Sequence, residues 1–329
     1  MKVLIIRFGD SEEVLFSTPI IRTLKTEYTE AEIDYLTDAT LIPLLKNNPY
    51  LNSIVTANEL DKKNLQQYTH IIDLQGSKTS RRIAKRTNAR VFTYDALNLK
   101  KWLYTQFKVD KLPNKHITDS FYELVGPLGI KADALGLDFF LNKEDKLPAD
   151  LTSLLSANDF VVFSLTAAYA TRQLPLTRMI ELCDKMNRPV VLIGEEKDKE
   201  KAEQLSSFFS THPDNEYEEG LAELGKRTSI INYCGKLNLN EQALLIKKAR
   251  YIFTHDSLHM AVASAFQKPI FSLWGNTTPK MGKYPYRTKF LILEKNGLSC
   301  RPCSTKGYNQ CPKQHFKCMH GITFDFYLP

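Results

Sequence analysis

Acidic residues lie where an apolar strand is expected to meet a helix near the N-terminus. Residues 3–6 form a short apolar run, and residues 14–27 show helical spacing. Asp10, Glu12 and Glu13 lie between the two. Phosphate commonly binds at such a β–α connection, but three carboxylates would repel it. A carboxylate at this position can instead accept a proton from an attacking hydroxyl group, which is general-base chemistry.

A second set of polar residues follows two apolar runs in the last third of the chain. Asp256 and Ser257 precede a small-residue helix expected at 258–266, so either one can cap it and its free N–H groups can bind an anion. The alternative is a simple helix cap with no ligand. The next connection contains Gly275, Asn276 and Thr277, whose backbone donors and hydroxyl suit a phosphate or a sugar. Two adjacent loops of this kind favour a ligand site.

Cations occur in two further connections. The loop after residues 160–165 carries Thr166, Thr171 and Arg172, and the arginine can hold a diphosphate or lie solvated at the surface. A basic helix expected at 77–87, which contains Lys78 and Arg81, fits either a phosphorylated or lipid-linked anionic substrate or a solvated face. Downstream, residues 100–108 mix lysines with aromatic side chains. That mixture suits a membrane interface, and a helix whose aromatic residues face the core is the alternative.

Four of the six cysteines are clustered near the C-terminus, at Cys300, Cys303, Cys311 and Cys318. A single CxxC pair with two further cysteines predicts either a structural Zn²⁺ site or reduced thiols packed in the tail. His315 and His320 are spare ligands for such a metal. Disulfides are unexpected if the chain is cytosolic.

Two repeated series of strands and helices must position these residues. Apolar runs of four to six residues alternate with helical segments throughout the chain, which is typical of parallel sheets with crossover helices. The run at 268–275 is expected to be the last clear strand, and a helix beginning at Asn240 is expected at 240–249. A polar stretch with a proline at 141–158 divides the chain into expected domains 1–150 and 151–329, the second with the cysteine-rich tail 300–318. The fold class is therefore α/β, with two open domains and a ligand cleft at the carboxyl ends of their strands.

Composition limits the class of protein. The chain has 329 residues, of which 43% are hydrophobic and 25% charged, as in ordinary globular proteins. No apolar run reaches the roughly 18 residues that a membrane span requires, and a cytoplasmic location is expected. The net charge of +7 allows contact with anionic lipid, phosphorylated sugars or nucleic acid. Nucleic acid is not expected as a partner, because no RNA- or DNA-binding module is evident.

The N-terminal segment MKVLIIRFGDSEEVLFSTPIIRTLK resembles the opening of glycosyltransferase family nine, the ADP-heptose:lipopolysaccharide heptosyltransferases. The segment FTHDSLHMAVASAFQKPIFSLWGNTTPKMGKYPY resembles that family's donor-binding signature. The resemblance implies a GT-B fold, with two Rossmann-like domains that face a cleft. It implies an N-terminal acceptor domain, a C-terminal nucleotide-sugar domain, inversion at the anomeric carbon and no metal in catalysis. It also implies ADP-heptose as donor, an anionic lipid-linked saccharide as acceptor, and a place at the inner face of the inner membrane.

The resemblance also assigns roles to residues. Glu13 stands at the position of the family's Asp and would be the catalytic base, with Asp10 or Glu12 as substitutes, and Arg172 would hold the diphosphate. The other expected donor-binding residues are Thr166, Thr171, Asp256, Ser257, Leu258, Gly275, Asn276 and Thr277. The expected acceptor-binding residues are Arg7, Asp10, Gln75, Lys78 and Arg81. Departures occur at Glu12, Leu258 and Ala261, where the family has Gly, Gly and His. A family member that binds nucleotide or glycan without transferring sugar is therefore the alternative.

Overall fold

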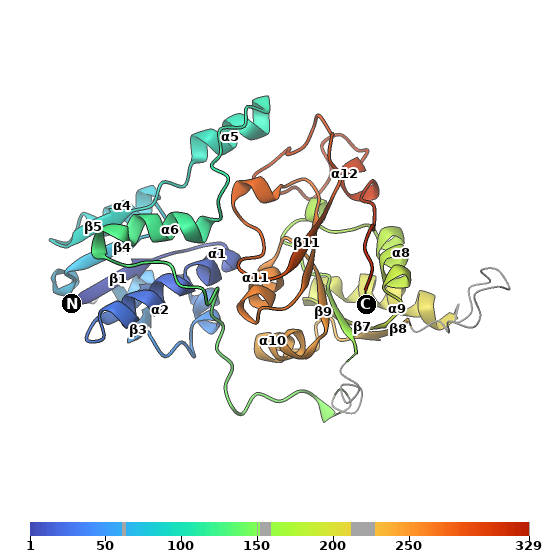
Figure 1. The fold of residues 1–329 in the computed structure, drawn as a ribbon, viewed down its shortest axis with the longest axis horizontal. Coiled ribbons are helices and arrows are strands. Elements are labelled where there is room, and N and C mark those ends of the chain that lie inside the picture. The colour runs from blue at the N-terminus through green and yellow to red at the C-terminus, as the bar shows by residue number, and fades with distance from the viewer. Residues whose placement is uncertain (61–63, 150, 152–158, 212–227, 329) are drawn as a thin grey trace.

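The computed structural model describes residues 1–60, 64–149, 151, 159–211 and 228–328. Two all-parallel sheets form the two lobes of the molecule (Figure 1). The N-terminal sheet has the order β3-β2-β1-β4-β5, with strands at Lys2–Ile6 (β1), Glu32–Leu36 (β2), Ser53–Val55 (β3), His70–Asp73 (β4) and Arg90–Thr93 (β5). The C-terminal sheet has the order β11-β10-β9-β6-β7-β8, with strands at Val161–Ser164 (β6), Pro189–Ile193 (β7), Ser229–Asn232 (β8), Tyr251–His255 (β9), Ile270–Trp274 (β10) and Phe290–Glu294 (β11).

Helices cover both faces of each sheet. In the N-terminal lobe they are Ser11–Phe16 (α1), Thr18–Glu27 (α2), Ala57–Leu60 (α3), Lys78–Ala84 (α4), Asn98–Phe107 (α5) and Ile117–Val125 (α6). In the C-terminal lobe they are Leu176–Met186 (α8), Lys199–Thr211 (α9), Leu239–Lys248 (α10), Leu258–Ala265 (α11) and Lys317–His320 (α12). No helix in the described ranges combines the length and apolar character that crossing a bilayer requires.

Strand β1 shows why the sheets are buried on both faces. Its side chains alternate between two apolar clusters, as the twofold period of a strand requires. Val3 and Ile5 belong to the cluster that contains the buried side chains of α1, α2 and α6, whereas Leu4 and Ile6 belong to the cluster of α3 and α4. A strand with four consecutive apolar residues, as at 3–6, is therefore typical of a central parallel strand.

The apolar core is continuous between the lobes. The cluster around α1 and α2 extends to Met260, Ala261 and Val262 of α11 and to the buried residues of α10. Figure 1 shows α1 and α11 side by side where the two lobes meet. The loops that follow the strands of both sheets therefore have a fixed relation to one another.

The predicted strands are confirmed. The structure differs from the sequence predictions in one additional strand and in the bounds of two helices. Residues 290–294 form β11, a partly exposed edge strand, so the expectation that 268–275 contains the last strand was wrong. The helix expected at 14–27 is two helices, α1 and α2, which meet at Ser17, just before Pro19 in the first turn of α2. The helix expected from Asn240 begins earlier, because the Asn238 side chain accepts a hydrogen bond from the Glu241 N–H and caps it. The expected domain boundary at 150/151 falls beside residues 150 and 152–158, which lie outside the described residues.

Candidate active site

A cleft of about 740 Å³ opens at the carboxyl ends of the strands of both sheets. Its walls come from the loops after β1, β4 and β5 in one lobe and from the loops after β6, β9 and β10 in the other. This is the edge at which ligands bind open parallel sheets. Eight of the residues predicted to act in catalysis or to bind donor or acceptor line it: Arg7, Asp10, Glu12, Glu13, Gln75, Arg172, Asp256 and Thr277.

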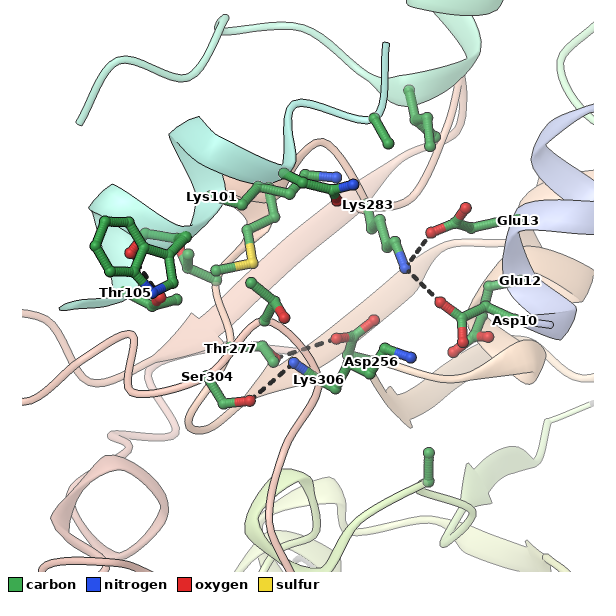
Figure 2. A pocket seen from close by; sticks show the side chains of 18 of the residues that line it. Asp10, Glu12, Glu13, Lys101, Thr105, Asp256, Thr277, Lys283, Ser304 and Lys306 are labelled. Carbon is green, nitrogen blue, oxygen red and sulfur yellow. Dashed lines mark hydrogen bonds and ion pairs between the residues drawn. The ribbon is translucent and has the colours of Figure 1, made fainter. Parts of the chain in front are cut away.

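Glu13 lies at this cleft with both carboxylate oxygens in ion pairs. Its Oε2 pairs with the Arg7 guanidinium, and its Oε1 pairs with the ammonium group of Lys283. The same ammonium group lies 3.1 Å from Oδ2 of Asp10 (Figure 2). Lys283 follows β10, so a cation of the C-terminal lobe crosses the cleft to the acidic loop of the N-terminal lobe.

The other two acidic residues of the loop have different surroundings. Glu12 is buried, which raises the pKa of its carboxyl group, and its Oε1 lies 3.7 Å from the Arg172 guanidinium. Burial also acts to raise the pKa of Asp10, but the attraction of Lys283 outweighs it and the pKa lies below its usual value. The three carboxylates that follow β1 therefore contact three different cations: Arg7, Lys283 and Arg172.

Arg172 and Asp256 form the second polar centre of the cleft. Their side chains make a buried ion pair, and the Thr277 hydroxyl donates to Oδ2 of Asp256 at 3.1 Å. Burial lowers the pKa of Arg172, but Asp256 and Glu12 more than compensate and the pKa is raised, so the guanidinium is charged. Oδ1 of Asp256 and Nε of Arg172 are buried without hydrogen-bond partners. Buried polar atoms are normally bonded, so these two are available to a ligand.

Other predicted donor residues lie around this centre and do not line the cleft. Thr171 and Asn276 line a neighbouring cavity, and both polar side-chain atoms of Asn276 are buried without partners. Thr166 and Ser257 are buried behind the cleft wall, and Leu258 packs against the core. Gly275 contributes close packing, because a Cβ there would lie 2.5 Å from the Thr171 carbonyl oxygen.

Two predicted acceptor residues are not brought to the cleft. Lys78 and Arg81 are exposed on α4, outside the cleft wall. The family has a histidine at the position of Ala261, and the nearby His259 does not take its place in the cleft. That imidazole is buried against the Ser164 hydroxyl at 2.6 Å, and burial lowers its pKa to about 4. His259 is therefore a neutral core residue.

The sequence interpretation missed the cations Lys283, Lys101 and Lys306 as cleft residues. Lys283 gave no signal, because it lies eight residues after Gly275 in an irregular loop. Lys101 was recognised only as part of a basic and aromatic helix. In the structure, burial together with the nearby cations Lys283 and Arg7 lowers the pKa of Lys101 to about 8.

The cysteine-rich tail braces the donor side of the cleft. Arg301 donates to the Gly275 carbonyl oxygen at 2.7 Å and to that of Thr277 at 2.9 Å. The Thr171 hydroxyl and the Tyr308 backbone exchange hydrogen bonds of 3.0 and 2.8 Å. The loops after β6 and β10 are thus held by residues 301–308.

Cys300, Cys303, Cys311 and Cys318 line one cavity of about 400 Å³, together with His315. All four thiols are free, and Sγ of Cys300 lies 3.8 Å from Nε2 of His315. As the side chains stand, no group of three or more His, Cys, Asp or Glu residues among those described could hold a metal ion. The zinc site expected from the cysteine spacing stays a prediction.

Comparisons with known proteins agree with this architecture. The family model described as "Glycosyltransferase family 9 (heptosyltransferase)" matches residues 60–314, which is more than half of the chain. Lipopolysaccharide heptosyltransferase 1 of Campylobacter coli is 21% identical over 307 residues, with 84% of each chain covered. A family 9 glycosyltransferase structure from Veillonella parvula has a TM-score of 0.66 at 18% identity, covering 89% of this chain and 86% of that one. The structure of E. coli ADP-heptose lps heptosyltransferase II has a TM-score of 0.59 at 18% identity, covering 96% and 97%. The two structural likenesses show a shared fold, which confirms the predicted GT-B class of two α/β domains.

Proposed function

Because this chain belongs to glycosyltransferase family 9, we propose that it transfers a heptose from ADP-heptose to a lipopolysaccharide-core or related surface-glycan acceptor. The observation that carries the proposal is the meeting, in one cleft, of a carboxylate loop from one lobe with a cation and unpaired polar atoms from the other. Curated heptosyltransferases of similar length support the substrate class.

We propose that the transfer inverts the anomeric carbon. The acceptor oxygen forms a bond to that carbon from the side opposite the diphosphate, and its proton passes to Glu13. The bond from the anomeric carbon to the diphosphate oxygen breaks, and the ADP leaves with the electron pair. Glu13 belongs to one lobe of the cleft and the ion pair of Arg172 with Asp256 to the other, which supports this stereochemistry, because base and leaving group can then lie on opposite faces of the sugar.

Arg172 and Lys283 are the cations best placed to stabilise the leaving diphosphate. Each is paired with carboxylates in the structure, Arg172 with Asp256 and Lys283 with Glu13 and Asp10. An incoming diphosphate competes for both cations. When Lys283 turns to the diphosphate, Oε1 of Glu13 becomes free to accept the acceptor's proton. Donor binding would thereby prepare the base.

Incubation with ADP-heptose and a heptose-free core acceptor tests the proposal. We expect the wild-type protein to transfer sugar, with the anomeric configuration of the product opposite to that of the donor by NMR. Glu13→Gln should bind ADP-heptose but lose transfer by roughly 10²–10⁴-fold, the usual contribution of a general base. Glu12→Gln is the matched control for Glu13→Gln, because Glu12 is one residue away and faces Arg172. Transfer that survives Glu13→Gln would remove Glu13 from the base role.

The second candidate function is binding of a nucleotide or glycan without transfer. It is favoured by the two ion pairs that occupy Glu13 and by Ala261, which is buried where the family has a histidine. This candidate predicts that ADP-heptose raises the melting temperature of the protein. It also predicts no ADP release with any acceptor. Measured transfer by the wild type would eliminate it.

We propose that the transfer uses no metal, and that the four tail cysteines hold a structural Zn²⁺. Their position around one cavity supports the second proposal, and the thiols would have to draw together to complete a tetrahedral site. Elemental analysis of protein purified without chelator should give about one zinc per chain. A metal-free protein of unchanged stability would refute the zinc site. Undiminished transfer in the presence of a chelator is expected if catalysis is metal-independent.

A further inference from the structure

Helix α5 exposes an apolar face that the proposed chemistry does not use. Leu99, Trp102 and Phe107 are 69%, 50% and 62% exposed, respectively. At 3.6 residues per turn these positions fall on one side of the helix, and Lys101 and Thr105 fall on the other. That other side lines the cleft, and Trp102, at the border between the two sides, lines it as well, so Leu99 and Phe107 are the residues of the apolar face that point away from the cleft. The alternative expectation that the aromatic residues of this segment face the core was wrong.

The helix projects from the body of the N-terminal lobe (Figure 1). Trp102 and Phe107 contact each other edge to face, with ring centroids 5.4 Å apart, and both remain accessible. Two residues after the helix ends, Val109 is also exposed. None of the segments that the structure describes covers this face. Ten residues are too few to span a bilayer, but they suffice to lie in its interface.

Exposed cations occur beside this apolar face in the chain and on helix α4. Lys100 and Lys111 flank it in the chain, and both are exposed. Helix α4 begins at the same rim of the cleft, since Ser77 and Asn98 both line it. Its exposed face carries cations at Lys78, Arg81, Arg82 and Lys85. An apolar stripe with leucine and aromatic residues beside several cations is complementary to a bilayer with anionic headgroups.

We propose that α5 inserts its apolar face into the headgroup region of an anionic bilayer while the cations of α4 lie over the same surface. The predicted role of Lys78 and Arg81 changes accordingly, from contact with the acceptor in the cleft to contact with lipid headgroups. The rim of the cleft formed by Ser77 and Asn98 then faces the membrane. An acceptor saccharide anchored in that membrane can enter the cleft without leaving the bilayer. Bilayer binding itself does not depend on sugar transfer.

Vesicle co-sedimentation of the full-length protein tests the proposal. We expect the wild type to sediment with phosphatidylethanolamine vesicles that contain phosphatidylglycerol, and to stay in solution with vesicles of phosphatidylcholine alone. The double variant Leu99→Asp/Phe107→Asp should weaken sedimentation by roughly tenfold or more, because two exposed apolar anchors are lost. Tyr327→Asp is the matched control, since Tyr327 is 84% exposed near the C-terminus, away from α5. Arg81→Gln/Arg82→Gln should reduce sedimentation with the anionic vesicles by roughly tenfold or more, at about 1 kcal/mol for each cation.

Several outcomes would overturn the proposal. One is wild-type protein that does not sediment with anionic vesicles at low salt. Another is equal sedimentation of the Leu99→Asp/Phe107→Asp variant, with an unchanged circular dichroism spectrum as evidence that it is folded. A third is a wild-type dimer by size-exclusion chromatography that the double variant dissociates, with no vesicle binding, which would assign the face to a second copy of the chain. Because no arm measures transfer, failure of the proposed function leaves these results interpretable.

Discussion

At the scale of single residues, the site combines a carboxylate that must accept a proton with cations that occupy it. Both oxygens of Glu13 are in ion pairs, so neither is free for an incoming proton until one cation moves. Arg7 is anchored by its hydrogen bond to the Leu74 carbonyl oxygen at 2.6 Å, whereas the partners of Lys283 among the described residues are the carboxylates of Asp10 and Glu13. Lys283 is therefore the cation that can exchange with a ligand.

Replacing Lys283 by methionine tests that exchange. We expect ADP-heptose affinity and kcat/KM to fall by roughly tenfold or more, because a charge-assisted contact with the diphosphate contributes about 1.5–3 kcal/mol. Lys280→Met is the matched control, since Lys280 lies on the same loop and pairs with Asp110 at the surface. Isothermal titration with ADP-heptose and steady-state rates give the two readouts. Equal affinity in the two variants would place the diphosphate elsewhere.

Replacing Lys101 by methionine should separate stability from binding. The folded-state pKa of Lys101 is about 8, lower than the 10.5 of an unperturbed lysine, so the charged form is disfavoured in the folded protein. The charged Lys101 therefore destabilises the folded protein, with its full effect below about pH 8 and a decreasing effect as the pH rises toward 10.5. We therefore expect Lys101→Met to raise the melting temperature at pH 7, with a smaller gain at pH 9.5. ADP-heptose binding should weaken in the same variant. A stability gain that does not change with pH would contradict this account.

At the scale of elements, the sequence was sufficient for the central strands and insufficient for the edges and the irregular loops. β1, β6 and β9 are apolar runs that can be buried only inside a parallel sheet, and each was predicted. β11 was missed although residues 290–293 form an apolar run of four, the pattern that identified the other strands; it is an edge strand in which only Leu293 of the five residues is buried.

The candidate site likewise contains residues that could be placed from the sequence and residues that could not. Residues directly after a central strand, such as Arg7, Asp10 and Asp256, could be placed at the cleft from the strand that precedes them. Lys283 could not, because its position depends on an irregular loop of the other lobe. The distinction between Glu12, which faces Arg172, and Glu13, which faces Lys283, depends on the orientation of α1 and is absent from the sequence pattern.

The connection after β10 gives a prediction at this scale. A methyl group at Gly275 would lie 2.5 Å from the Thr171 carbonyl oxygen and 2.6 Å from the end of the Met319 side chain. Gly275→Ala should therefore destabilise the protein by about 1–3 kcal/mol, as overpacking does, and weaken nucleotide binding by displacing the loop. Gly126→Ala is the control, because a methyl group there would meet nothing within 4 Å. Urea unfolding and thermal shift with ADP would measure both effects. Equal stability of the two variants would show that the loop is free to move.

At the scale of the whole molecule, His116 joins the two lobes. Its ring stacks on Tyr286 at 4.5 Å and meets Tyr284 edge-on at 5.0 Å, both on the loop that follows β10. The backbone N–H of Ile117 donates to the Gly282 carbonyl oxygen at 2.9 Å. Lys283 belongs to the same loop, so the contact that joins the lobes also positions the cation that reaches Glu13.

Burial of neutral histidines predicts how the stability of the whole molecule depends on pH. Burial lowers the pKa of His116 and His255 to about 3 and that of His259 to about 4, from an ordinary value of 6.5. The unfolded chain therefore takes up these protons first as the pH falls. Their contribution to stability is complete above pH 6.5 and is lost below it, at up to roughly 1.4 kcal/mol per pH unit for each histidine.

The variant His116→Phe isolates how much of this pH dependence comes from His116, the histidine that lies between the lobes. The phenyl ring keeps the aromatic packing, while the hydrogen bond from the Thr118 N–H to Nδ1 is lost at every pH, at a cost of about 1 kcal/mol. The unfolding free energy of the variant should consequently lie below that of the wild type at pH 7.5, approach it as the pH falls below 6.5, and exceed it near pH 5, where the wild type has lost about 2 kcal/mol. Urea unfolding at several pH values measures this difference directly, and other titrating groups cancel in it. A difference that stays constant with pH would mean that His116 titrates in the folded protein as it does in water.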